Sequence, residues 1–423
     1  MSSPSPDAKL RVRLSAHHAH ECRTPEVRVI YVEILIASAF LLAAFAVERF
    51  ERRTGVPMVI VMIALGLLTQ PLLRAQGIVA SELKTMVPIA GAIGVVLIVL
   101  EGALDIELRR ERIKLAAKAA AMSGAAFLLC AAAFIVIATR TLGLDYLQAA
   151  ILATPFAVMS STIAIPASQF LEQHAREFVV YESSVSDILG ILVFIALVNS
   201  GGTLQGFLTD LAGGGLLSLI LAFVFALALV VVSTRTDAHV RYIPLLAGLF
   251  AVYACGQLLH LSPLIMVLLF GLMLNNKEVL DRVPPLRSVA DKISPATVGE
   301  FKVLVQELTF AVRGFFFFLL GYSTNLSDLA VLRSWVACAV VLIIVYGVRQ
   351  VLLRTIEPQF AAKLAWIAPR GLLTVMLYLQ AVQLIPLPRY LDGTVRLVVI
   401  LSATIVALSR RAGSRDIAAA PAA

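Results

Sequence analysis

The feature that most constrains this chain is a series of apolar runs, each long enough to cross a lipid bilayer as a helix. About 20 residues, at about 1.5 Å per residue, cover the roughly 30 Å hydrocarbon core. Backbone polar groups inside lipid must be paired within the protein, which leaves helices as the structure for such runs. We therefore predict an all-α polytopic membrane protein with about 13 transmembrane helices, or 12 if the weakly separated eighth and ninth runs are one. The runs cover residues 30–48, 56–73, 87–104, 115–138, 146–166, 179–199, 212–233, 243–260, 262–275, 303–322, 334–353, 363–385 and 393–409.

Composition excludes several other classes of protein. Hydrophobic residues make up 60% and charged residues 15% of the 423 positions, which is too apolar for a soluble domain of this length. The net charge of +8 comes from Lys and Arg between the apolar runs and not from one basic face, so we expect no nucleic-acid partner. No span places a His near a Ser or Asp, and no His-Glu-x-x-His motif occurs, so we expect neither an enzyme nor a cofactor.

Loop charges predict how the chain is threaded through the bilayer. Most loop Lys and Arg fall on the cytoplasmic side if the N-terminus lies outside and the C-terminus inside. Polar residues 1–28 are predicted to be a disordered tail, 29–412 the transmembrane domain and 413–423 a C-terminal tail. The expected location is the inner membrane of a cell, crossed many times.

Ionisable residues within a span are costly and mark functional sites. In the sixth span, Glu182, Ser183, Ser186 and Asp187 lie on neighbouring turns and form one polar stripe. A carboxylate with adjacent hydroxyls offers hard oxygen ligands for a sodium ion and can also hold a proton. The alternative is a polar contact between helices, for which serines are suited, although such a contact does not require Asp187.

Two spans are predicted to be broken. In the fifth, Thr154 and Pro155 are followed by the hydroxyl run 160–162 and by Pro166, and in the twelfth Pro369, Arg370 and Gly371 interrupt an apolar stretch. Interrupted helices at corresponding places in two halves are typical of a transporter's binding site. The fifth span of the first six corresponds to the twelfth as the fifth of the last six, which predicts an inverted repeat around the seventh span.

Four segments occur in a characteristic order. They are Glu-Ser-Ser-Val-Ser-Asp at 182–187, Trp-Ile-Ala-Pro-Arg-Gly at 366–371, Val-Leu-Glu-Gly-Ala-Leu at 99–104 and Gly-Phe-Phe-Phe-Phe-Leu-Leu-Gly at 314–321. Over about residues 30–410 the chain thereby resembles the monovalent cation/proton antiporter superfamily, in particular sodium/proton exchangers of the NhaP type. The similar elements of that family are Glu-Ser-x-x-Asn-Asp, Trp-x-Gly-x-Arg-Gly, Phe-Glu-Gly-Gly-Leu and Phe-Phe-x-x-x-Gly.

The chain departs from the family pattern at two places. Ser186 stands where the family has an Asn, and the broken fifth helix lacks the Asp of the family's Thr-Asp-Pro. Its Ser-Ser-Thr run at 160–162 is instead similar to that of the related Kef-type branch. A cation would then meet one carboxylate and not two.

The resemblance implies roles for individual residues. Asp187 would be the carboxylate shared by cation and proton, Glu182 would pair with Arg349, and Arg370 would stabilise the broken twelfth helix. It also implies a homodimer, with an ion-carrying core at about 115–199 and 334–410 and a dimer scaffold at about 30–104 and 243–322.

The predicted activity is exchange of a monovalent cation, Na+ first, for H+ by alternating access. Alternatives are a K+/H+ antiporter, or a cation channel or transport-inactive ion sensor on the same fold. For Glu101, a cytoplasmic funnel and a snorkelling flank residue are equally favoured, and Arg313 is expected to pair with Glu307. The predicted ligands of the ion and proton are Asp187, Ser183, Ser186, Thr162, Ser161 and Thr154.

Overall fold

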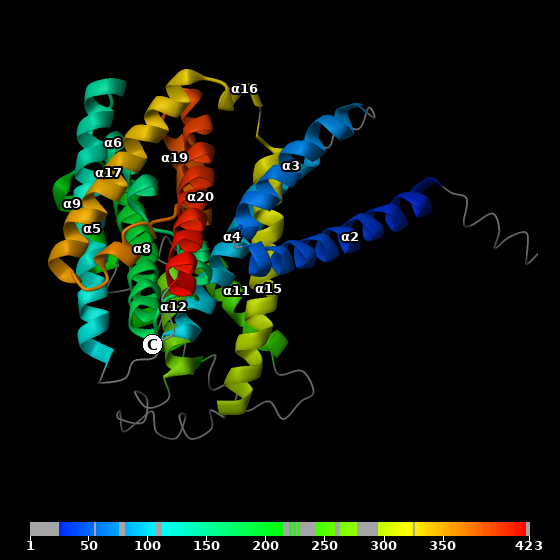
Figure 1. Cartoon of the computed structure of the whole chain (residues 1–423), viewed down its shortest axis with the longest axis horizontal. Coiled ribbons are helices and arrows are strands. Elements are labelled where there is room, and N and C mark those ends of the chain that lie inside the picture. The colour runs from blue at the N-terminus through cyan, green and yellow to red at the C-terminus, as the bar shows by residue number, and fades with distance from the viewer. Residues whose placement is uncertain are drawn as a thin grey trace, which may run out of the picture. The chain divides into compact units, whose positions relative to one another are not determined.

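The computed structural model is built from helices throughout the residues it describes, which are 25–54, 56–75, 81–106, 112–214, 220–228 without 222 and 226, 242–258, 263–276, 295–324 and 326–419. The all-α prediction is confirmed (Figure 1). The chain divides into two units, Met1–Thr54 and Gly55–Ala423. The helices are α2 (Pro25–Thr54), α3 (Met58–Ala75), α4 (Ser81–Asp105), α5 (Ile113–Leu142), α6 (Tyr146–Ala157), α7 (Ser161–Ser168), α8 (Gln173–Asn199), α9 (Leu204–Thr209), α11 (Tyr242–Leu258), α12 (Pro263–Asn275), α15 (Pro295–Tyr322), α16 (Leu326–Leu329), α17 (Leu332–Ile356), α18 (Ala361–Leu364), α19 (Leu372–Leu384) and α20 (Tyr390–Ala419).

The first unit contains one long helix, α2. It begins at Pro25, a residue suited to the first helical position because its missing N–H has no intrahelical partner there anyway. Residues 25–28, which we expected in the disordered tail, are therefore helical, and residues 1–24 lie outside the described part of the chain. At the other end of the chain, α20 continues to Ala419, so part of the predicted C-terminal tail at 413–423 is helical.

Apolar helices of membrane-spanning length make up much of the second unit. Within the described residues, six segments are long and apolar enough to cross a bilayer: 113–142, 146–168, 173–199, 298–322, 332–356 and 390–409. Shorter apolar helices add 58–71, 245–256, 266–275 and 372–384. The eighth and ninth runs form separate helices, α11 and α12. The seventh run, 212–233, lies partly outside the described residues, so the total of 13 stays a prediction.

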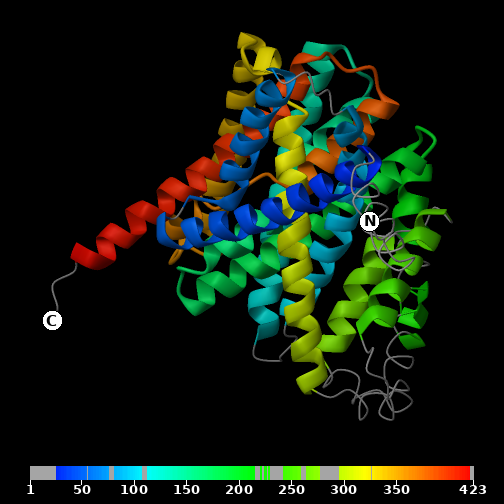
Figure 2. The same cartoon turned by 90° about the vertical axis from the view of Figure 1, so that its right-hand side faces the viewer.

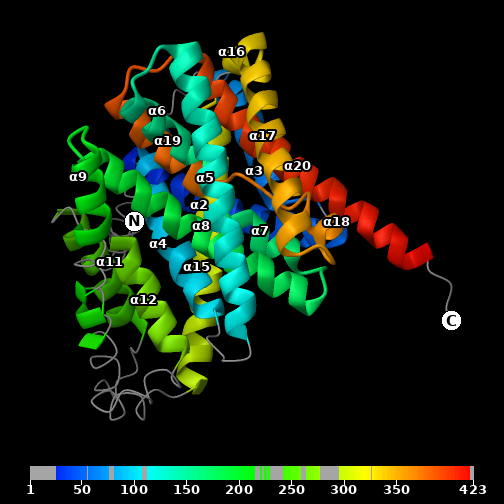
Figure 3. The same ribbon diagram turned by 90° about the vertical axis from the view of Figure 1, so that its left-hand side faces the viewer.

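The helices of the second unit form two groups. In one, α15 packs on α3 and α4, and α12 packs on α4 and α11 (Figure 2). In the other, α5 packs against α6, α8 and α17, while α17 packs against α20 and α6 against α19 (Figure 3). Helix α4 contacts α7, α8 and α19, and so connects the first group to the second.

Glycine allows α3 and α15 to approach each other closely. A Cβ atom at Gly321 would lie 2.9 Å from Ile63 Cα and against its carbonyl oxygen, and one at Gly66 would lie 2.6 Å from Tyr322 N. Such small-residue crossings are a common way for helices to pack within lipid, where close van der Waals contact replaces the hydrophobic effect.

Ion pairs connect helix ends that the loop charges assign to one side of the membrane. The connected helix ends include the N-terminal ends of α5, α8 and α15 and the C-terminal ends of α4 and α17. The relative directions of these helices therefore agree with the predicted topology, in which successive spans cross the membrane in opposite directions. Which side is cytoplasmic remains a prediction. The pairs are Arg112–Glu177 (2.9 Å), Lys118–Glu357 (3.3 Å), Lys302–Asp105 (2.7 Å) and Lys363–Glu172.

We predict that Gly321→Ala lowers the stability of the protein, because the added Cβ meets the backbone of α3, which cannot move aside cheaply; overpacking of this kind costs about 1–3 kcal/mol. The measurement is the thermal unfolding midpoint of the purified protein in detergent. Gly347→Ala on α17 is the matched control, since a Cβ there meets no atom within 4 Å. It should raise stability by up to about 1 kcal/mol through helix propensity. Equal midpoints for the two variants would contradict this account of the α3–α15 crossing.

Candidate functional site

Two broken helices meet in the second group, as predicted for the fifth and twelfth spans. Helix α6 ends at Ala157 and α7 begins at Ser161, while α18 ends at Leu364 and α19 begins at Leu372. The non-helical segments touch, because the Ser160 N–H donates to the carbonyl of Pro369 at 2.9 Å. Each break thus supplies a hydrogen-bond partner that the other has lost.

The break in the fifth span lies between its prolines and at neither of them. Pro155 sits inside α6 and Pro166 inside α7, and residues 158–160 between them are non-helical. A proline has no N–H, so each leaves the carbonyl four residues earlier without its usual helical donor. The prolines weaken the hydrogen-bond ladder on both sides, and tertiary contacts decide where the helix parts.

Asp187 belongs to α8, and its side chain lies at the N-terminus of α7. Its Oδ2 atom accepts the Ser161 hydroxyl at 2.5 Å and the Ser161 backbone N–H at 3.3 Å. The side chain is 6% exposed, and within the described residues its Oδ1 atom has no hydrogen-bond partner. A helix N-terminus favours a negative charge through its dipole and free N–H groups. The carboxylate is therefore held by one oxygen and leaves the other available.

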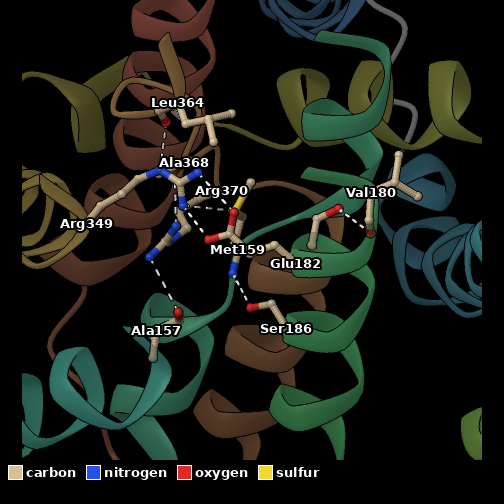
Figure 4. Close-up of polar contacts among 10 residues, drawn as sticks. Ala157, Met159, Val180, Glu182, Ser186, Arg349, Leu364, Ala368 and Arg370 are labelled. Atoms are coloured by element: carbon tan, nitrogen blue, oxygen red, sulfur yellow. Dashed lines mark hydrogen bonds and ion pairs between the residues drawn. The ribbon is translucent and has the colours of Figure 1, made fainter. Parts of the chain in front are cut away.

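Two of the predicted ligand hydroxyls have other partners at the break. The Ser186 hydroxyl oxygen accepts the backbone N–H of Met159 at 2.9 Å (Figure 4). Thr162 shares a hydrogen bond with Ser160, with 2.7 Å between their side-chain oxygens. These residues satisfy and shape the interrupted backbone beside Asp187, a role that spacing along α8 could not distinguish from ion binding.

The remaining two predicted hydroxyls bond to their own helices. Ser183 donates to the Val180 carbonyl at 3.3 Å, and Thr154 donates to the Ala150 carbonyl at 2.9 Å. Of the predicted hydroxyl ligands, the structure thus brings only Ser161 into hydrogen-bond contact with Asp187 among the described residues.

Glu182 and Arg349 form a buried two-point ion pair one turn before Asp187. The Nη1 and Nη2 atoms of Arg349 lie 2.5 and 3.0 Å from the two Glu182 oxygens (Figure 4). The residues are 2% and 3% exposed, and Arg349 Nε also donates to the Leu364 carbonyl at 2.9 Å. Because both charges and most of their hydrogen-bonding atoms are satisfied, this pair joins α8, α17 and the end of α18 rigidly.

Arg370 connects the two breaks. Its guanidinium donates to Phe156 O at 2.9 Å, Ala157 O at 3.4 Å and Ala368 O at 3.1 Å. Phe156 and Ala157 are the last residues of α6, so the positive charge faces the negative end of that helix. Arg370, expected to stabilise the broken twelfth helix, also contacts the end of α6 in the fifth span.

A small cavity, lined by both apolar and polar side chains, adjoins these buried charges. It measures about 20 Å³ and is lined by Glu182, Ser186, Arg349 and Arg370, among others. That is enough for about one water molecule, which needs a volume of roughly 10–15 Å³ and several polar partners. The cavity can therefore hold about one water molecule beside the charged pair.

The structure places Glu101 and Arg313 beside the site from the first helix group. Glu101 is partly buried on α4 and interacts electrostatically with Arg313. Arg313 Nη1 donates to the Thr162 carbonyl at 3.1 Å. Within the described residues it forms no ion pair with Glu307, so the expected pairing along α15 is wrong. An arginine can reach across to another helix, which spacing within one helix does not capture.

Two glycines shape the site and were not singled out as site residues from the sequence. A Cβ at Gly190 on α8 would overlap the Val158 side chain in the first break. A Cβ at Gly371 would lie 2.5 Å from Ser160 Oγ and 2.9 Å from Thr162 Oγ1. Both positions let an interrupted backbone pack closely, and a glycine on the polar stripe of the sixth span was the available signal for Gly190.

Comparisons with known proteins identify the family and the fold. A family model described as "Sodium/hydrogen exchanger, transmembrane" matches residues 36–409. The chain is similar to a structure of the sodium proton antiporter MjNhaP1 from Methanocaldococcus jannaschii at pH 8, with a TM-score of 0.68 and 21% identity over 90% of this chain and 97% of that one. An electron-microscopy structure of the same antiporter has a TM-score of 0.66 and 18% identity over 92% and 96% of the two chains. No curated protein matches.

We predict that Glu182→Gln lowers stability by about 3–5 kcal/mol, because it leaves the buried Arg349 charge without its partner. Thermal unfolding of the purified protein measures the effect. The matched control is Glu172→Gln, which breaks the exposed pair with Lys363 and should change stability by less than about 1 kcal/mol. Similar losses in the two variants would show that the Glu182–Arg349 pair does not stabilise the crossing.

Proposed function

Because the chain belongs to the sodium/hydrogen exchanger family, we propose that it exchanges Na+ for H+ across the membrane, with Asp187 as the group that binds both ions. The observation that carries this proposal is the buried Asp187 carboxylate, whose Oδ2 is held by Ser161 and whose Oδ1 has no partner among the described residues. The fold shared with a sodium proton antiporter supports it.

The chemistry of exchange follows from competition at one carboxylate. A buried carboxylate is costly unless its charge is balanced, and either a cation or a proton can balance it. A cation at Oδ1 would be bound by hard oxygen ligands, among which the Ser161 hydroxyl is the nearest candidate. Binding of a proton removes the charge that holds the cation, and loss of the proton restores it. One site thus serves both ions in turn, facing one side of the membrane and then the other.

The fixed charges around Asp187 favour exchange without net charge movement. Glu182 and Arg349 neutralise each other, and the Arg370 charge faces the carbonyl end of α6. Neither arrangement depends on which ion occupies Asp187. One proton would then replace one monovalent cation, giving electroneutral exchange.

A K+/H+ antiporter, a cation channel and a transport-inactive ion sensor are the competing functions. What favours them is the absence of an acid from the broken fifth span, where Ser161 contacts Asp187 of α8 in place of a second carboxylate. A channel would conduct cations without proton coupling, and a sensor would bind them without flux. Cation size does not follow from the count of hydroxyls, so sodium, lithium and potassium must be compared directly.

We further propose that the protein acts in the inner membrane of a cell, with its N-terminus outside and its C-terminus in the cytoplasm. The loop charges carry this orientation. A homodimer formed through about residues 30–104 and 243–322 is proposed from the family resemblance, and it would leave the group that contains Asp187 free to move.

Asp187→Asn should abolish cation-dependent proton flux, because an amide can neither bind a proton nor balance a cation at neutral pH. The measurement is dequenching of a pH-sensitive dye in everted vesicles on addition of Na+, Li+ or K+. Asp145→Asn is the matched control, since Asp145 caps α6 at its exposed end and Asn caps equally well. Full flux in Asp187→Asn would overturn the mechanism, and a response to K+ alone would replace sodium as the substrate.

Ser161→Ala should raise the apparent KM for the cation about tenfold, because a hydrogen bond to a charged group is worth about 1.5–3 kcal/mol and the variant also loses the nearest oxygen ligand. The same dye assay, run over a range of cation concentrations, provides the measurement. Ser168→Ala is the control on the same helix, where the hydroxyl bonds to the Ile165 carbonyl. An unchanged KM in Ser161→Ala would remove Ser161 from the site.

A further inference from the structure

The backbone carbonyl of Thr162 lacks its usual partner within α7. In an α-helix it would accept the N–H of residue 166, which here is a proline without an N–H. An arginine of another helix supplies the missing donor, because Arg313 Nη1 of α15 lies 3.1 Å from Thr162 O. An orphaned carbonyl in lipid is costly, so this contact removes a real penalty.

The contact lies next to the residue that holds Asp187. Ser161 precedes Thr162 and gives both its N–H and its hydroxyl to Asp187 Oδ2. The Thr162 hydroxyl shares a hydrogen bond with the Ser160 hydroxyl, and the Ser160 N–H donates to the Pro369 carbonyl. The first turn of α7 is therefore anchored at Asp187, at the second break and at Arg313. If the Arg313 anchor were lost, Ser161 would be held less firmly against the carboxylate.

Arg313 makes this contact from the other helix group. Its helix, α15, packs on α3 and α4, whereas α7 packs on α8. Nearby, the two groups meet through glycine and apolar side chains, since Cβ atoms at Gly91 and Gly94 of α4 would meet Met376 and Leu372 of α19. A surface of this kind has little directional preference, and the hydrogen bond from Arg313 to Thr162 adds one. Glu101 on α4 interacts electrostatically with Arg313 from within its own group.

We propose that Arg313 is a positioning residue for the ion site, which completes the hydrogen-bonding of α7 that Pro166 leaves open and so keeps Ser161 in place beside Asp187. The bond requires the Thr162 carbonyl of α7 to stay within reach of the Arg313 side chain of α15. Cation affinity is therefore coupled to the relative position of the two helix groups. This inference rests on the proposed exchange at Asp187 and deepens it by naming what orders the site.

The chain offers a direct test of whether Arg313 acts through this hydrogen bond or only through its charge. Arg313→Met removes both, while Pro166→Ala restores an N–H within α7 that can bond to Thr162 O. If the hydrogen bond is what matters, the double variant Arg313→Met/Pro166→Ala regains what Arg313→Met loses. If the charge is what matters, the double variant stays as impaired as the single one. Arg333→Met, an exposed arginine on α17, controls for loss of a positive charge.

Two readouts are taken on full-length protein in lipid nanodiscs and proteoliposomes. Hydrogen–deuterium exchange of the α7 amides should be about tenfold faster in Arg313→Met and return to near the wild-type rate in the double variant. The apparent KM for Na+ in the dye assay should rise about tenfold and return likewise, with a smaller change in maximal rate. Arg333→Met should match wild type in both. Thermal unfolding of each variant identifies any general loss of folding.

Each outcome decides the proposal. The positioning role would be overturned if hydrogen–deuterium exchange of α7 were unchanged in folded Arg313→Met. It would also be overturned if the added Pro166→Ala change did not return the exchange rate to near the wild-type value. If neither wild type nor any variant exchanges cations for protons while α7 exchange behaves as expected, the antiport proposal fails and the structural role of Arg313 stands. If the protein transports cations and Arg313→Met speeds hydrogen–deuterium exchange of α7 but leaves the KM for Na+ unchanged, Arg313 orders α7 without positioning the ion site. The proposal is then rejected.

Discussion

The constraint on which the rest of this structure depends is that backbone groups in lipid must find partners, even where helices are interrupted. The breaks at 158–160 and 365–371 satisfy each other through the bond from Ser160 N–H to Pro369 O. Side chains provide the remaining partners: Ser186 for Met159 N–H and Arg370 for the end of α6. The buried polar backbone at the breaks is thus satisfied by side chains and backbone groups of other segments, in the case of Arg370 and Phe156 more than 200 residues apart along the chain.

The same arrangement separates buried charges by role. Glu182 and Arg349 are paired at two points, so their charges balance each other. The charge of Arg370 is stabilised by the carbonyl groups at the end of α6. Asp187 differs, because within the described residues one of its oxygens is unpartnered. A charge that is balanced by fixed neighbours stabilises the fold, whereas a charge that is only half satisfied can bind an ion. This contrast is the physical basis for placing exchange at Asp187 and assigning the other pair to structure.

Glycine and proline set how closely these elements pack and which hydrogen-bonding positions stay open. Gly66 and Gly321 bring α3 and α15 into close backbone contact, which makes their group compact. Gly190 and Gly371 admit the interrupted segments of the other group, and Pro166 opens a hydrogen-bonding position that Arg313 fills from across the boundary. Close packing within each group and a small number of directional contacts between the groups are compatible with the alternating access proposed for this protein.

The sequence by itself determined the helical class, the broken fifth and twelfth spans and the family, because apolar length, proline position and motif order are local properties. It also singled out Asp187, Glu182, Arg349 and Arg370. It could not separate Ser161, which contacts Asp187, from Ser186 and Thr162, which satisfy backbone and neighbouring hydroxyl groups. Nor could it locate the partner of Arg313 on α7. Only the tertiary structure decided these points, because a hydroxyl or guanidinium bonds to whichever unpaired donor or acceptor folding brings within about 3 Å. The spacing of residues along one helix does not predict which atom of another helix that will be.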